Sequence, residues 1–216
     1  MGFSGWPAEA IEFYEGLEAD NSKTYWNENK SVYDNFVLRP MNELLAELSS
    51  EFGATKLFRP YRDVRFRTDK APYKTTIAAT LEFGGYVQLS TAGLGAGGGM
   101  WMMAPDQLDR YRKAVSLEQT GQSFAKLLET LRAEGIEAGG HDSLRTAPKG
   151  YPKDHPRIEL LRYKGVTCWQ QWPAGPWLGR ATAKNRVVKL FRAARPLTEW
   201  LDANVGSSTL EHSGRR

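Results

Sequence analysis

Apolar residues recur at helical spacing through the first part of the chain. Pro7 opens a helix, because its fixed backbone angle suits a first turn, and the pattern ends near Asn21. The apolar stripe of this helix comprises Ala10, Phe13, Tyr14 and Leu17. Ser22 can cap a second helix, which Pro40 is expected to kink or break before the same spacing continues. The pattern therefore predicts helices over most of residues 7–52.

The middle of the chain alternates apolar and polar residues, as half-buried strands do. Residues 63–68, 76–83 and 86–91 follow this period of two, and a fourth strand is expected over residues 94–103. Gly84-Gly85 suits a tight hairpin turn. Glycines weaken the fourth strand, so they indicate a bulge or a close backbone approach by a helix or a ligand. These segments predict an antiparallel β-meander.

The rest of the chain is mostly helical. The expected elements are helices from Pro105, from Thr120 and over residues 157–163, a strand at 166–172, and a C-terminal helix from Ala181 that Pro196 interrupts. Residues 205–216 are expected to form a flexible C-terminal tail. There is no clean linker and no internal repeat. Antiparallel strands bracketed by N-terminal and C-terminal helices predict a single α+β domain over residues 1–204.

Composition narrows the class of protein. One cysteine, Cys168, allows no internal disulfide, and with three scattered histidines it gives none of the usual zinc spacings. No metal and no cofactor is therefore predicted. No apolar run approaches the roughly 18 residues of a membrane span, and the N-terminus lacks the pattern of a signal peptide. We therefore expect a cytoplasmic protein with no membrane partner.

Basic residues are concentrated in one segment. Residues 56–74 hold seven Lys or Arg against two Asp, whereas the net charge of the whole chain is +4. Like charges at this density repel one another, so folding must neutralise them with carboxylates or leave them facing an anionic partner. Residues 1–55 carry ten Asp or Glu against three Lys or Arg. Either the acidic N-terminal helices pack beside the basic segment and pair with its arginines, or the segment forms a site.

The basic segment also carries a motif. Its fixed positions are Arg59, Arg62, Asp63, Arg65, Phe66, Asp69, Lys70 and Tyr73. Their spacing, R-x-x-R-D-x-R-F-x-x-[DN]-K-x-x-Y, resembles the signature of a bacterial family with fungal relatives, catalogued as domain of unknown function 2461. Further segments that resemble the family are residues 3–7, 21–30, 98–103 and 147–156. The resemblance implies a fold and no established activity.

The candidate ligand-binding residues lie in this motif or close to it. They are Arg59, Arg62, Asp63, Arg65, Asp69, Lys70, Tyr73 and Lys74, together with Trp101 from the glycine-rich strand. Arginine forks bind phosphate or carboxylate bidentately, lysine adds a point charge, and an aspartate among them can orient a guanidinium. We expect a basic pocket, floored by the meander, for a phosphorylated or carboxylated small molecule. Trp101 would supply an apolar wall.

Two other functions fit the same residues. Basic residues interleaved with Phe58, Tyr61 and Phe66 could bind nucleic acid through phosphates and stacked bases. A structural Arg–Asp lattice in a partner-binding domain would use the same residue types. No catalytic residue is assigned, because residues 95–99 lack the dinucleotide-binding fingerprint and His155 is better placed as a helix cap than as a base. The sequence leaves enzymatic activity and oligomeric state open.

Overall fold

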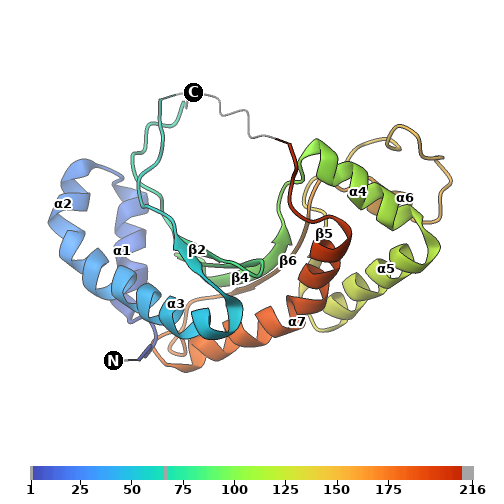
Figure 1. Ribbon diagram of the computed structural model, residues 1–216. Helices are drawn as coiled ribbons and strands as arrows, with labels where there is room; N and C mark the ends of the chain where they lie inside the picture. The colour runs from blue at the N-terminus through green and yellow to red at the C-terminus, as the bar shows by residue number, and fades with distance from the viewer. Residues whose placement is uncertain (1, 66–67, 211–216) are drawn as a thin grey trace. The chain divides into compact units, whose positions relative to one another are not determined.

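The computed structural model describes residues 2–65 and 68–210 (Figure 1). It combines helices with one six-stranded sheet, so the predicted α+β class is confirmed. The chain divides into two compact units, each made of two stretches: Met1–Ala96 with Gln171–Phe191, and Gly97–Gln170 with Arg192–Arg216. Because each unit draws on two separate stretches, the division does not follow chain order. The single domain over residues 1–204 stays a prediction.

Helical segments open the first unit. They are α1 (Ala8–Ala19), α2 (Lys23–Val32), the π-helix η1 (Tyr33–Leu38) and α3 (Arg39–Phe52). Ser22 caps α2 as predicted, because its hydroxyl accepts a hydrogen bond from the Tyr25 amide at 3.1 Å. Pro40 does not end the helix. The wider π turn precedes it, and the Arg39 amide donates to the carbonyl oxygen of Asp34, five residues back.

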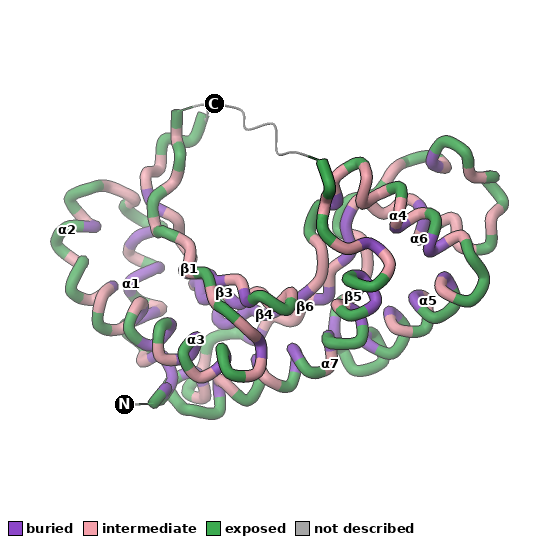
Figure 2. The backbone as a smooth tube through the Cα atoms, viewed as in Figure 1, coloured by how far each residue is buried: buried purple, intermediate pink, exposed green. Residues whose placement is uncertain are grey.

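The strands of the sheet are β1 (Thr55–Leu57), β2 (Ile77–Leu81), β3 (Gly85–Ser90), β4 (Gly93–Met100), β5 (Glu137–Gly139) and β6 (Val166–Trp172). Their order is β1-β2-β3-β4-β6-β5, and the pairs β1–β2, β2–β3 and β5–β6 are antiparallel. In the first unit, Ile77 pairs with Leu89 and Ala79 with Val87, so alternate residues of β2 and β3 share one face. All four residues are buried, and Figure 2 colours buried stretches of the backbone purple.

Glycines in β4 make room for the backbone beside them. Gly93 has a φ of 96°, and a Cβ there would overlap the carbonyl oxygen of Trp172. A Cβ at Gly97 would overlap the Cys168 carbonyl oxygen and would lie 2.7 Å from the Trp169 ring. The close approach predicted for this strand therefore comes from β6. At Gly97 the neighbour is thus a strand, and the expectation of a helix or a ligand there is wrong; Gly93 lies just before the strand predicted over residues 94–103.

Helices dominate the second unit. They are α4 (Pro105–Ser116), α5 (Glu118–Ala133), α6 (Ile158–Leu161) and the C-terminal part of α7 (Thr182–Asn204). Pro196 lies inside α7, so the predicted interruption is wrong. Leu197 and Leu201, which follow Pro196 in the same helix, are both buried. The free energy gained by burying them offsets the cost of the backbone hydrogen bond that proline cannot make. No helix in the described part of the chain is both long and apolar enough to cross a bilayer.

Residues 205–210 are bound to α4. Arg110 donates to the carbonyl oxygens of Val205 and Ser207, and the Asp106 carboxylate accepts from the Thr209 amide at 2.8 Å. The bond from the Thr209 amide is the main cause that holds the pKa of Asp106 well below its usual range. This part of the predicted tail is thus fixed by hydrogen bonds, and residues 211–216 lie outside the described residues.

Candidate functional site

A two-stranded arm extends from β1 and β2 in the first unit (Figure 1). We call it the basic arm and define it as residues 58–65 and 68–76. Its two sides are joined by backbone hydrogen bonds: the Arg62 amide donates to the Pro72 carbonyl oxygen at 2.8 Å. Tyr61 and Tyr73 lie opposite each other in an isolated antiparallel bridge. The arm therefore continues the β1–β2 pair beyond the sheet.

The strand predicted over residues 63–68 is wrong for the described part of that segment. Asp63 and Asp69 each accept a hydrogen bond from the amide two residues further on, at 3.2 and 2.9 Å. Such local bonds between side chain and backbone turn the chain and compete with a strand ladder. Phe66, which the alternating pattern placed in the core, lies outside the described residues.

Tyr73 anchors the arm to the N-terminal helices. Its ring stacks on Trp26 of α2, with ring centroids 4.3 Å apart and planes 5° from parallel. The Asn21 side chain bonds both backbone groups of Tyr73, donating to the carbonyl oxygen at 3.1 Å and accepting from the amide at 3.0 Å. Burial raises the pKa of the Tyr73 hydroxyl, and the nearby Tyr61 adds to the shift. The Tyr73 side chain is 5% exposed, so it is a packed part of the base of the arm.

Asn21 and Trp26 contact Tyr73 of the motif, and the sequence patterns did not predict these contacts. The helical pattern placed Asn21 only at the end of the first helix, and it gave Trp26, inside the second helix, no role in the motif. In the structure Asn21 lies just past α1, where its side chain is directed to the arm instead of to its own helix. The single available signal was the family resemblance of residues 21–30, which contain both positions.

Two arginines of the motif form ion pairs with aspartates of the arm itself. Arg62 Nη1 lies 2.7 Å from Asp69, and Arg65 Nη2 lies 2.7 Å from Asp63. Hydrogen bonds from the Arg65 side chain, then from its amide, lower the pKa of Asp63 from 3.8 to about 2. The contribution of the Arg65–Asp63 pair is thus complete above pH 3.8 and is lost as the pH falls through 2. In both pairs the carboxylate is local; pairing with the acidic N-terminal helices was one of the two alternatives that the sequence left open.

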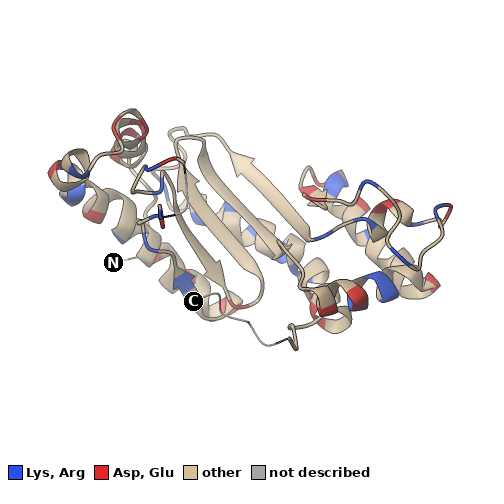
Figure 3. Ribbon diagram, turned by 90° about the horizontal axis from the view of Figure 1, so that it is seen from above, with Lys and Arg blue, Asp and Glu red and all other residues tan. Residues whose placement is uncertain are grey.

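Four basic side chains of the same segment form no ion pair with a carboxylate among the described residues: Lys56, Arg59, Lys70 and Lys74. Of these, Arg59 lies near enough to Asp63 to contribute to its lowered pKa. Lys70 donates to the Val64 carbonyl oxygen at 3.1 Å, and Lys74 donates to the Arg59 carbonyl oxygen at 2.9 Å. Bonds to neutral carbonyls leave the lysine charges in place. Lys56 and Arg59 are exposed, and Figure 3 marks basic residues in blue. The arm therefore keeps positive charge that its own aspartates do not cancel.

Trp101 is the predicted site residue that lies in the other unit. The remaining eight predicted residues are all on the basic arm, which belongs to the first unit. Trp101 is 65% exposed and its ring stacks on His141, with centroids 3.6 Å apart. The structure brings eight of the nine residues together on one element, and the part of Trp101 in a ligand site stays a prediction.

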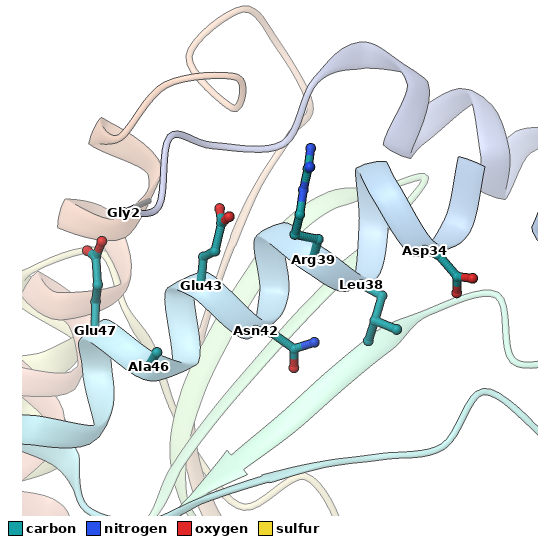
Figure 4. A pocket seen from close by; sticks show the side chains of 8 residues that line it. All are labelled: Gly2, Asp34, Leu38, Arg39, Asn42, Glu43, Ala46 and Glu47. Carbon is teal, nitrogen blue, oxygen red and sulfur yellow. The ribbon is translucent and has the colours of Figure 1, made fainter. Parts of the chain in front are cut away.

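A hollow of about 420 Å³ lies along η1 and α3 in the first unit (Figure 4). Its lining residues are Gly2, Asp34, Leu38, Arg39, Asn42, Glu43, Ala46 and Glu47. Glu47 is paired with Lys184 and also accepts from the Phe3 amide at 2.6 Å, and these bonds, that of Lys184 first, lower its pKa. The lining includes no residue of the basic arm and carries more acidic than basic side chains. It therefore does not suit the anion that the motif predicts.

The described residues offer no evident catalytic group or metal site. His155 Nδ1 accepts a hydrogen bond from the Arg157 amide at 3.0 Å, but the N-cap position of α6 is Arg157, without a side-chain cap bond, so the predicted cap is wrong. Burial raises the pKa of the Cys168 thiol to about 11, so the thiol is protonated at neutral pH. Within residues 2–65 and 68–210, no three His, Cys, Asp or Glu side chains gather as metal ligands would.

Arg62→Ala is expected to lower the free energy of unfolding more than Arg65→Ala does. The Arg62 side chain is 23% exposed and the Arg65 side chain is 76% exposed, so truncation at 62 removes packed stem as well as an ion pair. We expect a loss of about 1 kcal/mol at Arg62 and a smaller loss at Arg65. Urea denaturation of both variants measures the difference. Equal losses would contradict the unequal packing of the two side chains.

The chain is similar to known proteins in sequence and in structure. A family model described as "Conserved hypothetical protein (DUF2461)" matches residues 9–200. A solved structure of a conserved hypothetical protein from Pyrococcus furiosus is similar over 79% of this chain and 98% of its own, with 14% sequence identity and a TM-score of 0.39. A search of curated proteins finds no match. Because the family model covers most of the chain and the whole basic arm, the chain belongs to the DUF2461 family of conserved hypothetical proteins.

Proposed function

We propose that this protein binds a phosphate- or carboxylate-bearing ligand through the basic arm. The observation that carries the proposal is the set of four cations that form no ion pair with a carboxylate in the described residues, Lys56, Arg59, Lys70 and Lys74. Arg59 and Lys74 lie at the same level of the arm, since Lys74 donates to the Arg59 carbonyl oxygen. A guanidinium fork and an ammonium group from such neighbouring positions would suit one anionic group.

The two ion pairs support the same site indirectly. Asp69 and Asp63 each pair with a guanidinium. Each also accepts a hydrogen bond from a backbone amide two residues further on, which fixes a turn of the chain. Arg62 uses one of its five donors on Asp69, which leaves donors for a ligand. In the finer form of the proposal, the strands of the meander beside the arm form the floor of the anion site. No reaction is part of the proposal.

A second function is favoured by the anchor of the arm. Tyr73, Asn21 and the two Arg–Asp pairs brace a projecting hairpin, and a braced hairpin is also what a partner-binding domain would present. In that case the pairs have a structural role, and small anions should not stabilise the protein. The two functions therefore differ in their response to the same ligands.

The proposed function predicts that pyrophosphate raises the melting temperature. A ligand that binds only the folded state stabilises it by RT ln(1 + [L]/Kd), or about 2.7 kcal/mol at a hundredfold excess over Kd. The measurement is differential scanning fluorimetry with inorganic phosphate, pyrophosphate and a nucleotide, each compared with sodium chloride at equal ionic strength. Lys70→Ala should lose much of the shift while folding normally, because exposed lysines contribute within about 0.5 kcal/mol to stability.

Lys126→Ala is the matched control. Lys126 is an exposed lysine of α5 in the second unit, so its removal changes the net charge by the same amount without touching the arm. It should keep the full shift. A full shift in Lys70→Ala would remove Lys70 from the site. No shift with any anion would reject the proposed function and favour the braced partner-binding domain.

A further inference from the structure

The cations that form no ion pair among the described residues lie at different levels of β1 and of the arm that continues it. Lys56 is on β1, Lys74 reaches the Arg59 carbonyl oxygen, and Lys70 reaches the Val64 carbonyl oxygen farther out. At a strand rise of about 3.3 Å per residue, positions 56 to 64 span up to about 26 Å. A single phosphate group is too small to reach all of these cations at once. A chain of linked phosphates can contact every one of them.

An exposed aromatic ring lies among these cations. Tyr61 is 51% exposed, and it faces Tyr73 across the bridge between the two sides of the arm. Behind it, the Trp26 ring lies 6.1 Å away and the Tyr73 ring 5.6 Å away. This backing restricts the Tyr61 ring, so stacking another ring on its exposed face costs little further conformational entropy.

The helix next to the Tyr61 ring is α2, through Trp26. The charged residues of α2 are Lys23, Glu28 and Lys30, and Lys30 is paired with Asp34. The charges of α2 itself therefore do not oppose the cations of the arm.

From the spacing of the cations and the position of Tyr61, we infer that the ligand of the arm is a single-stranded nucleic acid. Phosphates follow Lys56, Arg59, Lys74 and Lys70, and a base stacks on Tyr61. A single strand fits because its bases can unstack from one another and stack on an aromatic side chain. The bases of a duplex are already stacked and paired. The inference rests on the proposed function, since it names the ligand class of the same arm.

Binding is tested by fluorescence anisotropy with the full chain and a labelled oligothymidylate of about 20 nucleotides. Each phosphate neutralised on a single strand contributes about −0.7 to the slope of log K against log salt, so four contacts predict a slope near −3. A labelled duplex of the same length is the comparison. Affinity for the duplex should be several-fold weaker at equal salt concentration.

Tyr61→Ala separates stacking from charge. Loss of a base–aromatic stack costs about 1–3 kcal/mol, which corresponds to a 5- to 150-fold weaker affinity, while the salt slope should stay unchanged. Phe83→Ala is the matched control, because Phe83 is 59% exposed in the same unit but lies between β2 and β3, away from the arm. It should bind like the unmodified protein. Lys70→Ala should instead reduce the salt slope by about 0.7.

The outcomes distinguish this inference from the function on which it rests. A melting shift with pyrophosphate that depends on Lys70, together with no binding of the oligothymidylate, would overturn the inference and keep the proposed function. Equal affinity for duplex and single strand, or an unchanged affinity in Tyr61→Ala, would also overturn it. No response to small anions or to the oligonucleotide would reject both.

Discussion

Tyr73→Ala is expected to lower the free energy of unfolding by about 3–5 kcal/mol, the usual cost of removing a large buried aromatic side chain. Tyr73 is 5% exposed and its ring stacks on Trp26 at 4.3 Å, so alanine leaves a cavity against a second aromatic ring. The arm should also open locally, because its base loses the anchor. Urea denaturation measures the first effect, and hydrogen exchange at the amides of Arg62 and Lys74 measures the second.

Tyr73→Phe is the control for this substitution. Phenylalanine keeps the ring that stacks on Trp26 and keeps the backbone groups that bond to Asn21. Its stability should stay within about 1 kcal/mol of the unmodified protein, since the volume of the packed ring is conserved. If Tyr73→Ala left the exchange of the arm amides unchanged, the ring would not be its anchor.

Gly93→Ala is expected to destabilise the protein by about 2–5 kcal/mol. The φ of 96° at Gly93 costs an L-residue about 1–2 kcal/mol, and the added Cβ meets backbone that has no side-chain freedom to move aside. The overlapping atoms are the Trp172 carbonyl oxygen and, at 2.6 Å, the Ala174 amide nitrogen. Either β6 shifts away from this position or the turn before β4 changes. Thermal and chemical denaturation both report the loss.

Gly135→Ala separates the two causes. Gly135 also has a positive φ, 76°, but a Cβ there meets no atom within 4 Å. The Gly135→Ala variant should therefore be less stable only by the cost of the left-handed conformation, about 1–2 kcal/mol. The difference between the two substitutions measures the steric effect of β6. Equal losses at both positions would show that conformation alone matters and that β6 does not restrict Gly93.

The arm combines rigidity with unneutralised charge, and this combination gives the proposed function its physical basis. Asp63 and Asp69 take one guanidinium each and also turn the backbone, so the arginines become part of the scaffold. The lysines bond to backbone carbonyls, which direct their side chains without cancelling their charge. A preordered cationic surface loses less entropy on binding an anion than a flexible one does.

Much of the fold followed from local patterns. The helical stripe before Asn21, the cap at Ser22 and the strand at 166–172 match α1, α2 and β6, because each pattern is set by neighbours in sequence. The short strands β1 and β5 were missed, since three residues carry too little periodicity to stand out. The motif located the arm, because its charge density is a property of the sequence alone.

Where local rules failed, contacts between distant residues had decided. Pro196 stays within α7 because burial on that helix outweighs the lost hydrogen bond. Residues 63–68 are the exception, because there the reason is local: the side chains of Asp63 and Asp69 bond backbone amides two residues further on, which competes with a strand ladder. Gly93 and Gly97 of β4 are needed because the backbone of β6 packs against them, and β6 lies about 75 residues further along the chain.

The sequence by itself determined the α+β class, the family, most of the helices and the segment that carries excess positive charge. These depend on composition and on spacing within a few residues. Only the tertiary structure decided that the segment is an arm, that Asn21 and Trp26 hold it through Tyr73, and which cations form no ion pair with a carboxylate. Ion pairs and ring stacks form between side chains that the fold brings within a few ångströms, and spacing along the chain does not encode which of several candidates will meet.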